Sequence, residues 1–434
     1  MNKQLSILIL FILILAVPVT AFDYIWGGEL NLNGEAPELQ GTVFAAASTD
    51  SLNLWFSGRW NDLVNLDMDA SLISESDYRF GVAIDTQELG YFGDDRVLYP
   101  EISSFNIFGS YGSCYYRAGR QLLSDPAALI VSHPVDGILL GTQLGASSLD
   151  LQLGYSGLVN ENASTLTLSV NDLAGDHNAE FGAPRLIEKL NWSYPGLYEQ
   201  SLSLSFLAQQ DLHQSGDMVE GSEKLDSQYL ELVLKGFLLP ELAYKLSGVG
   251  ETGSYGGSSI MAGVGRLEFS YFPANNNSSL GLDCLYSSGD SWDRVDYYAS
   301  GMETDVDTLS QYMPISAVSG QGYVEVFELG NISTIGAFFR VSPGEVFSAE
   351  LRGTTFFRTK PGPVSSTLIL NDDNDDSFIG QEGLISLVLE PASDVRFAFR
   401  SAVLYMGDLI TIVDELEEYF PVLFRLGLDF SLKF

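Results

Sequence analysis

The chain has 434 residues and a formal net charge of −36, yet 46% of its residues are hydrophobic and only 18% are charged. A disordered acidic chain would contain far less apolar material, so the composition excludes that class. The negative charge also excludes nucleic-acid binding, because phosphate contacts require a basic surface.

The first 21 residues have the composition of a secretory signal peptide. Residues 1–3 are a weakly positive start, 5–17 are apolar, and the small residues 19–21 precede the expected cleavage site. The mature chain, 22–434, is expected to form one domain. No later segment offers about 18 consecutive apolar residues without charge, so the exported chain has no candidate membrane-spanning helix.

Apolar and polar residues alternate with a period of two along most of the mature chain. The alternation is clear in 78–85, 149–156, 201–206, 347–358 and 395–400. Successive side chains of a strand point to opposite faces, so each of these segments is predicted to be a strand. Such strands are about ten residues long, close to the length that crosses a bilayer when tilted.

The two phases of this alternation differ in chemistry. The apolar phase is nearly free of charge, while the polar phase holds Arg, Ser, Gly, Asp and Gln. A basic side chain facing lipid at the bilayer midplane costs about 2–4 kcal/mol, which explains its confinement to one phase. Backbone groups in hydrocarbon must all be paired, so strands cross a membrane only as a closed barrel. The sequence therefore predicts an all-β fold, a closed antiparallel transmembrane β-barrel.

The predicted connections alternate between short and long. Short turns are predicted at 74–77, 112–113, 194–197, 342–344 and 391–393, and long loops at 88–101, 122–136, 209–227 and 358–381. Outer-membrane barrels have short periplasmic turns and long outer loops. Two strand-like segments, 164–170 and 323–329, break the alternation and are assigned to outer loops of about 158–185 and 287–330. About 20 strands remain, with a range of roughly 18–22.

The last strand ends on an aromatic residue. Its apolar phase runs from Val422 at every second position to Phe430, Leu432 and Phe434. This strand resembles the C-terminal recognition signature of bacterial outer-membrane β-barrels. The resemblance implies a porin-like protein of the cell outer membrane, in contact with membrane lipid, whose last strand is read by the barrel assembly machinery. Residue by residue it covers only about the last fourteen positions.

Arginines on the polar phase are candidates to line a lumen. They are Arg79, Arg117, Arg120, Arg340, Arg352, Arg396, Arg400 and Arg425. Walls of charge set selectivity in channels, so these residues could form a positive side of a water-filled pore. Alternatively, they pair with carboxylates such as Glu350 and Asp429 and brace a filled interior.

The loop 122–136 is a candidate constriction. It carries Asp125, His133 and Asp136 around an apolar patch at 127–131. An apolar patch is unusual in a solvated loop, so the loop is expected to fold into the barrel or to pack on its rim.

Other chemistry has weaker support. The acidic run 371–376 could bind Ca²⁺, but it lacks the spacing and the Gly of a calcium loop, so a solvated loop is favoured and neither metal nor cofactor is expected. Cys114 and Cys284 are expected to be free thiols. No catalytic motif is present, and the three histidines fall in predicted loops, so an enzyme is not expected.

The sequence favours a channel for passive diffusion of small polar solutes or ions. The sign of its ion selectivity stays open, because the acidic total favours cations whereas the arginines of the lumen favour anions. The alternative is a surface-exposed adhesin or a structural barrel with a filled lumen. In that case the loops 158–185 and 287–330 would bind a partner, with Tyr297, Tyr298 and Tyr312 as contact residues.

Overall fold

The computed structural model describes residues 23–40, 43–59, 64–83, 88–169, 171–172, 181–197, 199–213, 224–273, 277–291, 308–318, 320–366, 374–409 and 422–434. At 23, 37–40, 43–46, 77–83, 88–96 and 197 only the backbone is described. The predicted signal peptide lies outside these ranges and stays a prediction. In the described part of the chain, no helix is long and apolar enough to cross a membrane.

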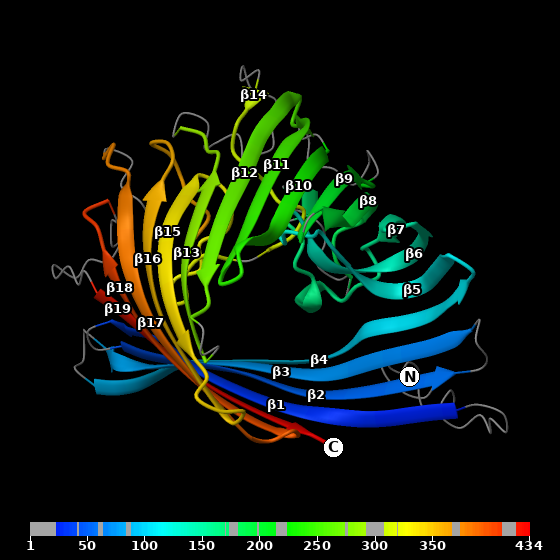
Figure 1. Ribbon diagram of the computed structural model, residues 1–434. Helices are drawn as coiled ribbons and strands as arrows, with labels where there is room; N and C mark the ends of the chain where they lie inside the picture. The colour runs from blue at the N-terminus through cyan, green and yellow to red at the C-terminus, as the bar shows by residue number, and fades with distance from the viewer. Residues whose placement is uncertain are drawn as a thin grey trace.

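Eighteen strands form a closed antiparallel barrel (Figure 1). The first strand, β1, pairs with β2 on one side and with the last strand, β19, on the other, so the sheet closes. A further strand, β14 (Thr308–Leu309), is part of a loop and pairs in parallel with β12. The barrel strands are β1 (Asp23–Gln40), β2 (Val43–Arg59), β3 (Asn65–Ala83), β4 (Glu88–Tyr111), β5 (Cys114–Ser124), β6 (Ser132–Leu144), β7 (Ser147–Tyr155), β8 (Arg185–Leu197), β9 (Gln200–Asp211), β10 (Asp226–Leu239), β11 (Leu242–Tyr255), β12 (Ser258–Tyr271), β13 (Ser278–Ser287), β15 (Ile332–Val341), β16 (Phe347–Arg358), β17 (Phe378–Ala392), β18 (Val395–Met406) and β19 (Val422–Lys433).

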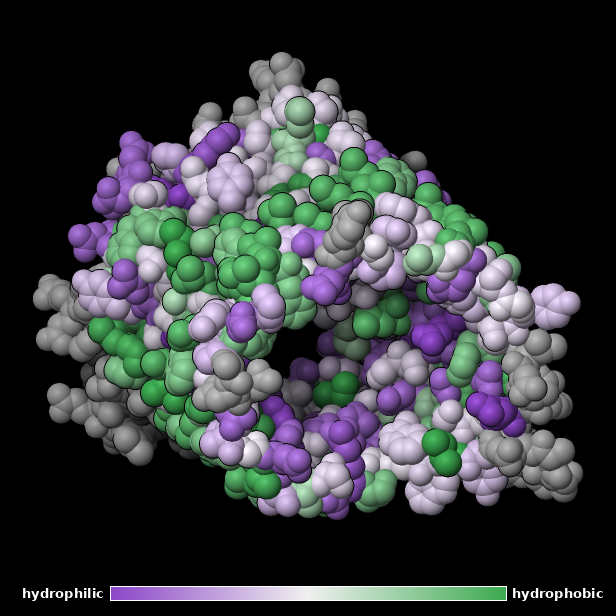
Figure 2. Space-filling model, in the orientation of Figure 1, coloured by the Kyte–Doolittle hydropathy of each residue, from purple (hydrophilic) through white to green (hydrophobic). Residues whose placement is uncertain are grey.

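The two faces of the wall differ as the alternation predicts. On β10, Leu230 and Leu232 are 57% and 47% exposed on the outside, whereas Glu231 and Val233 are buried inside. Apolar side chains cover much of the outer surface of the strands in Figure 2. Hydrocarbon offers no hydrogen-bonding partner, so a closed ladder behind an apolar outer face is the arrangement that a bilayer requires.

The predicted fold class is confirmed, and the 18 strands are the lower end of the predicted range. The inner end of the barrel, as we name it, carries Phe434 and the short turns, and the outer end carries the long connections. Numbered in chain order, the main outer loops are L3 (125–131), L4 (156–184), L5 (212–225), L7 (288–331), L8 (359–377) and L9 (407–421). As predicted, the described parts of 164–170 and 323–329 lie in loops, L4 and L7.

Three predicted connections are wrong. The supposed turn 194–197 is an irregular end of β8, which continues to Leu197. The supposed turn 74–77 lies inside β3, and the supposed loop 88–101 lies inside β4. The ladder between β2 and β3 is unbroken from Val43↔Gly81 to Arg59↔Asn65. The polar run 74–77 contains neither Gly nor Pro to favour chain reversal, so the backbone continues to pair with its neighbours.

Three outer loops fold into the barrel and fill part of it. Their buried side chains form one hydrophobic cluster with the inward face of the wall. The cluster includes Leu129, Ile130 and Val131 of L3, Leu166 of L4, Tyr312, Ile315 and Phe327 of L7, and Tyr229, Val249 and Val264 of the strands. The interior thus has an apolar, filled part and a remaining polar part.

Candidate functional site

L3 is held in its inward position by its own first residue. The carboxylate of Asp125 accepts the backbone N–H groups of Leu129 (2.9 Å), Ile130 (2.9 Å) and Val131 (2.8 Å). Glu231 of β10 accepts the N–H of Ala127 at 2.8 Å. Buried N–H groups are costly without an acceptor, so these contacts fix the loop against the wall.

The predicted constriction loop is shorter than expected. L3 covers only 125–131, and two of the three candidates, His133 and Asp136, belong to β6. His133 is fully buried, and its Nδ1 lies 3.1 Å from the Thr165 hydroxyl of L4. The alternation of β6 begins at Ser132, and the sequence contains no turn residue that marks this start.

L7 crosses the interior from β11 to β17 and β19. On one side, the Met313 N–H donates to Glu251 on β11 at 2.9 Å. On the other side, Glu382 on β17 accepts the N–H groups of Tyr323 (2.7 Å) and Val324 (2.6 Å). We call the described residues of this segment, 313–318 and 320–324, the strap. Its contacts connect β11 with β17 through the interior.

Tyr323 joins the strap to the arginines of the wall. Its ring lies 5.2 Å from the Arg425 guanidinium and 5.7 Å from that of Arg400. Arg425 also donates to the Tyr323 carbonyl at 3.0 Å. Burial, together with the negative charge of Glu35, raises the pKa of Tyr323 above its ordinary value. Its hydroxyl rests against Gly427 of β19, where only a residue without a Cβ leaves room.

The Gly427→Ala variant is expected to displace Tyr323 and to change the single-channel conductance. A Cβ at this position would lie 2.1 Å from the Tyr323 hydroxyl, so the ring must move. The hydroxyl is the end of a flexible side chain that can move away, so the free energy of unfolding should fall by only about 1 kcal/mol. Gly353→Ala is the control, since nothing lies within 4 Å of an added Cβ there. Equal conductances in both variants would contradict the claim that the strap, through Tyr323, narrows the lumen.

On β15 and β16, two predicted arginines share one carboxylate. Glu350 accepts from Arg340 Nε at 2.5 Å and from Arg352 Nε at 2.9 Å. The Phe338 ring lies 4.5 Å from the Arg340 guanidinium. Arg340 keeps 51% of its side chain exposed although it belongs to the inner face. The group is therefore neutralised in part and is still in contact with solvent-accessible space.

A second set of ion pairs lies on β18, β19 and β1. Arg400 Nη2 is 2.7 Å from Asp429 Oδ2, and Arg425 pairs with Glu35 across the closure of the barrel. Arg400 keeps 34% of its side chain exposed. Together with Arg340 and Arg352 they form the arginine ladder, a name we keep for these four residues. The pairing with Glu350 and Asp429 is the alternative that the sequence analysis named, whereas Glu35 as the partner of Arg425 was not predicted.

The remaining predicted arginines are placed differently. Arg396 lies near the inner end, 3.6 Å from Glu390, and Arg117 is exposed with its guanidinium 5.5 Å from the Phe108 ring. The side chain of Arg79 lies outside the described part of the structure. Arg117 and Arg396 therefore lie near the inner mouth, as Arg340 at the end of β15 also does.

Arg120 braces the wall where β4 and β5 part. The two strands pair only from Tyr111↔Cys114 to Phe105↔Arg120 (Figure 1). Beyond this point the guanidinium donates to Glu101 (3.0 Å) and Asp136 (2.8 Å) and to the carbonyl of Leu158 in L4 (2.7 Å). Its side chain is 12% exposed. The expected role in lining a pore does not fit, because the guanidinium is fully engaged in the wall.

The adjoining wall, β1–β4, carries acidic side chains that the sequence analysis missed. Glu29, Asp67, Asp69 and Glu75 belong to its inner face. Asp67 accepts from the Ser57 hydroxyl at 2.6 Å, and Glu75 from the Tyr99 hydroxyl at 2.9 Å. None of the four forms an ion pair with a described Lys or Arg. The alternation of Asn65, Asp67 and Asp69 with apolar neighbours could have revealed this face.

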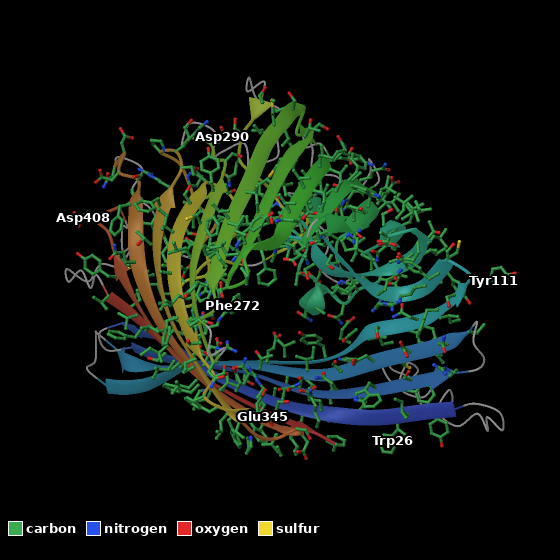
Figure 3. All side chains as sticks on the ribbon, in the orientation of Figure 1. Trp26, Tyr111, Phe272, Asp290, Glu345 and Asp408 are labelled. Carbon is green, nitrogen blue, oxygen red and sulfur yellow. The ribbon has the colours of Figure 1, made fainter. Side chains whose placement is uncertain are left out.

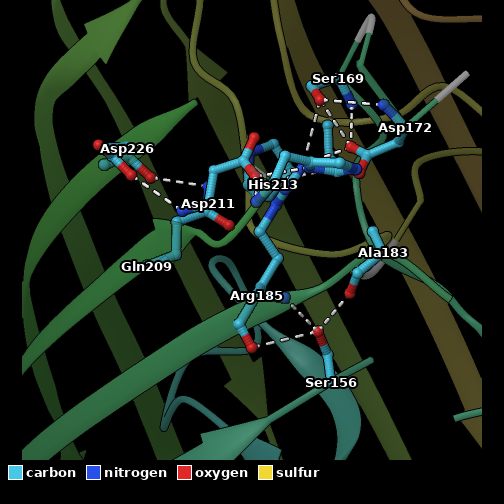
Figure 4. A network of polar contacts seen from close by, with 12 residues as sticks. Ser156, Ser169, Asp172, Ala183, Arg185, Gln209, Asp211, His213 and Asp226 are labelled. Carbon is cyan, nitrogen blue, oxygen red and sulfur yellow. Dashed lines mark hydrogen bonds and ion pairs between the residues drawn. The ribbon is translucent and has the colours of Figure 1, made fainter. Parts of the chain in front are cut away.

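A buried ionic cluster ties L4 and L5 to the outer ends of β8 and β9 (Figure 4). Arg185 is fully buried, with Nη1 2.8 Å from Asp211 Oδ1 and Nη2 paired with Asp172. His213 Nδ1 lies 2.7 Å from the same Asp211 oxygen. This cluster was not predictable from the sequence, since its members come from four separate elements.

The other predicted groups are readily located. The Phe434 backbone exchanges two hydrogen bonds of 2.9 Å with Gly28, so the last residue is tied to the first strand. Cys114 and Cys284 are free and exposed, as predicted. The described residues contain no group of three or more His, Cys, Asp or Glu side chains placed to hold a metal ion. Residues 371–373 of the acidic run lie outside the described ranges.

Comparisons with known proteins show a likeness of fold. No protein-family model and no curated protein matches the sequence. The solved structure of Pseudomonas aeruginosa OccK5 (OpdH) matches with a TM-score of 0.58 and 11% identity, over 95% of this chain and 98% of that one. The outer membrane protein OpdK of the same organism, crystallised with vanillate, matches with a TM-score of 0.59 and 11% identity, also over 95% and 98%. The chain therefore has the fold of the outer-membrane β-barrels represented by the Occ and Opd proteins of Pseudomonas.

Proposed function

We propose that the protein is a channel of the cell outer membrane, through which small polar solutes or ions diffuse passively. The observation that carries this proposal is the exposure of the arginine ladder. Arg340 and Arg400 point into the barrel, yet they keep 51% and 34% of their side chains exposed. Arg340 lies one residue before the inner end of β15, where a mouth alone exposes it, whereas Arg400 lies in the middle of β18. A mid-strand side chain inside a filled barrel would be buried, so the exposure of Arg400 supports a water-filled part of the lumen beside the strap. Figure 2 shows an opening near the centre of the view, with both hydrophilic and hydrophobic residues on its rim.

In this proposal L3 and the strap narrow the channel, and the ladder lines it. Solutes pass down their gradients and are filtered by the width of the pore and by its charges. Arg117 and Arg396 would meet solutes near the inner mouth. No step requires catalysis or a cofactor. OpdK, which shares the fold, was crystallised with vanillate, and this supports a small organic solute here.

The proposal also covers assembly of the barrel in the outer membrane. Phe430, Leu432 and Phe434 would serve as the signal for the barrel assembly machinery, and the apolar outer face would contact membrane lipid. The paired ends of β1 and β19 support this, because the last strand must bind the first for the barrel to close.

A structural barrel or adhesin with a filled lumen is the second candidate. The hydrophobic cluster between L3, L4 and L7 favours it. Against it, Tyr312 is only 1% exposed, so it is unavailable to a partner at the surface. The other two expected contacts, Tyr297 and Tyr298, lie outside the described residues.

Liposome swelling tests the channel. Vesicles that contain the refolded mature chain are expected to swell in isosmotic solutions of small sugars and amino acids, at rates that fall with solute size. Vesicles with the same protein left unfolded are the control. If folded, inserted protein admits no solute, the filled-lumen candidate replaces the channel.

A further inference from the structure

We propose that the seam between β4 and β5 is a lateral portal, through which neutral single-chain amphiphiles pass between the bilayer and the lumen. The inference rests on the proposed function, because a portal needs an open lumen to lead into. It adds a second route and a class of solute: molecules with one apolar chain and an uncharged head that carries hydroxyl or amide groups. L4 closes the portal in this structure.

The wall loses its backbone pairing at this seam. β4 pairs with β5 only over 105–111, whereas both strands continue beyond it, paired with β3 and β6 on their other sides. In Figure 3, Tyr111 marks the paired end, from which the two strands diverge. Gly119 lies where they part, with φ +121°, and a Cβ there would be 2.0 Å from the Phe105 carbonyl oxygen. This glycine therefore allows β5 to bend away from β4.

L4 covers the open edge of β4 through side chains. Among the described residues, no backbone–backbone hydrogen bond joins 97–104 to L4. By contrast, β12, which also extends beyond its neighbour β13, is covered by the parallel strand β14. At the seam, Glu101 accepts the Asn160 N–H, and the Tyr99 hydroxyl donates to the Asn162 carbonyl at 3.4 Å. Unpaired backbone in hydrocarbon must be covered by protein, and this cover can move without breaking a ladder.

The seam lies at the depth of the apolar outer face. On the outer face of β5 and β6, the pair Arg120 and Asp136 lies between Ile138 towards the inner end and Leu122 towards the outer end. Both apolar side chains are exposed, and so is Phe105 on the β4 side of the seam. In a barrel, such exposed apolar positions contact lipid. The strands therefore part towards the bilayer rather than towards water.

Two buried polar side chains lie without a partner on the inner side of the seam. Among the described residues, neither Asn106 Oδ1 nor Gln121 Nε2 has a hydrogen-bond partner, although both residues are buried. Gln121 lies two positions along β5 from Gly119, the register partner of Asn106. An unpaired acceptor and an unpaired donor on one face suit a head group with hydroxyl or amide groups. Since Arg120 neutralises Glu101 nearby, the site favours an uncharged head.

Arg120 holds L4 at the seam. Its guanidinium bridges Glu101 and Asp136 and donates to the Leu158 carbonyl of L4 at 2.7 Å. Hydrogen bonds from charged groups are stronger than those between neutral groups. Loss of this side chain should therefore shift L4 towards a displaced position by about 10-fold or more, which opens the portal.

Single-channel block by monodecanoylglycerol dissolved in the bilayer tests the portal. Brief blocks of the current are expected, with a frequency that rises with the amphiphile content of the membrane, and glycerol alone should cause none. Arg120→Gln should raise this frequency by about 10-fold. The control Arg266→Gln removes an arginine that contacts two carboxylates away from the seam, Glu268 and Asp283, and should leave the frequency unchanged. An open channel that is never blocked, or equal frequencies in the two variants, would overturn the portal and leave the channel intact.

Spin labels on L4 test the depth of the seam without requiring a channel. Leu158→Cys and Leu168→Cys, each combined with Cys114→Ser and Cys284→Ser, label two leucines that are 49% and 50% exposed. The label at 158 is expected to collide more often with oxygen, which concentrates in the bilayer, and the label at 168 with a water-soluble nickel complex. Equal access of the nickel complex to both labels would show that the seam opens to water and would overturn the portal. Folded protein that forms no channels would overturn the proposed function, and the portal with it.

Discussion

Replacement of Arg185 by methionine will lower the free energy of unfolding by about 3–5 kcal/mol. The guanidinium is fully buried between Asp172 and Asp211, and its removal leaves two buried carboxylates without their cation. His213 contacts both carboxylates, with Nδ1 2.7 Å from Asp211 and Nε2 3.6 Å from Asp172, but one imidazole offers fewer donors than the guanidinium. Because Asp172 belongs to L4, the loop should also detach from β8. Urea titration of the refolded barrel in lipid vesicles, followed by tryptophan fluorescence, measures the loss.

Two further variants make this test specific. Arg396→Met removes an exposed ion pair with Glu390 and should change stability by less than about 0.5 kcal/mol. Adding Asp172→Asn and Asp211→Asn to Arg185→Met should restore part of the loss, since it removes the uncompensated charges. A cost in Arg185→Met no greater than in Arg396→Met would show that the cluster is not a structural tie.

Replacement of Asp125 by alanine will release L3 from the interior. Three buried N–H groups, those of Leu129, Ile130 and Val131, lose their acceptor at once. Each buried donor left unpaired costs about 1–3 kcal/mol, so the free energy of unfolding should fall by about 3 kcal/mol or more. The loop should leave its position, and the single-channel conductance should become larger and noisier.

Asp125→Asn is the matched control for this variant. It retains one acceptor oxygen and the same size, so its loss of stability should be clearly smaller. If Asp125→Ala keeps both the stability and the conductance of the parent, the carboxylate does not hold L3 inside the barrel.

Much of the barrel was predictable because its energetics repeat along every strand. In β19 and the following Phe434, apolar side chains alternate with Arg425, Asp429 and other polar residues. The alternation arises because one face of the strand contacts lipid and the other faces the lumen. The alternation of short and long connections showed that the strand-like segments of L4 and L7 do not belong to the barrel wall. It failed at 74–77 and 88–101, because polar runs in strands resemble turns when the pairing partner is unknown.

The interior was less predictable, because its contacts join residues far apart in the chain. The apolar patch of L3 indicated a loop that packs inward, but nothing in the pattern points to Glu251 or Glu382 as acceptors for L7. The phase of Arg340 and Arg352 and their pairing with Glu350 could be read from neighbouring positions, whereas the pair of Arg425 with Glu35 depends on closure of the barrel between β19 and β1. The cluster around Arg185 was unpredictable for the same reason, because its members lie far apart in the chain.

Single-channel recording tests the central claim, an open polar passage beside the strap, most directly. The refolded mature chain in a planar bilayer is predicted to give stable, stepwise conductance, with steps that change in Gly427→Ala and not in Gly353→Ala. Protein with an intact, inserted barrel that gives no steps under any voltage would contradict the claim and indicate a filled lumen.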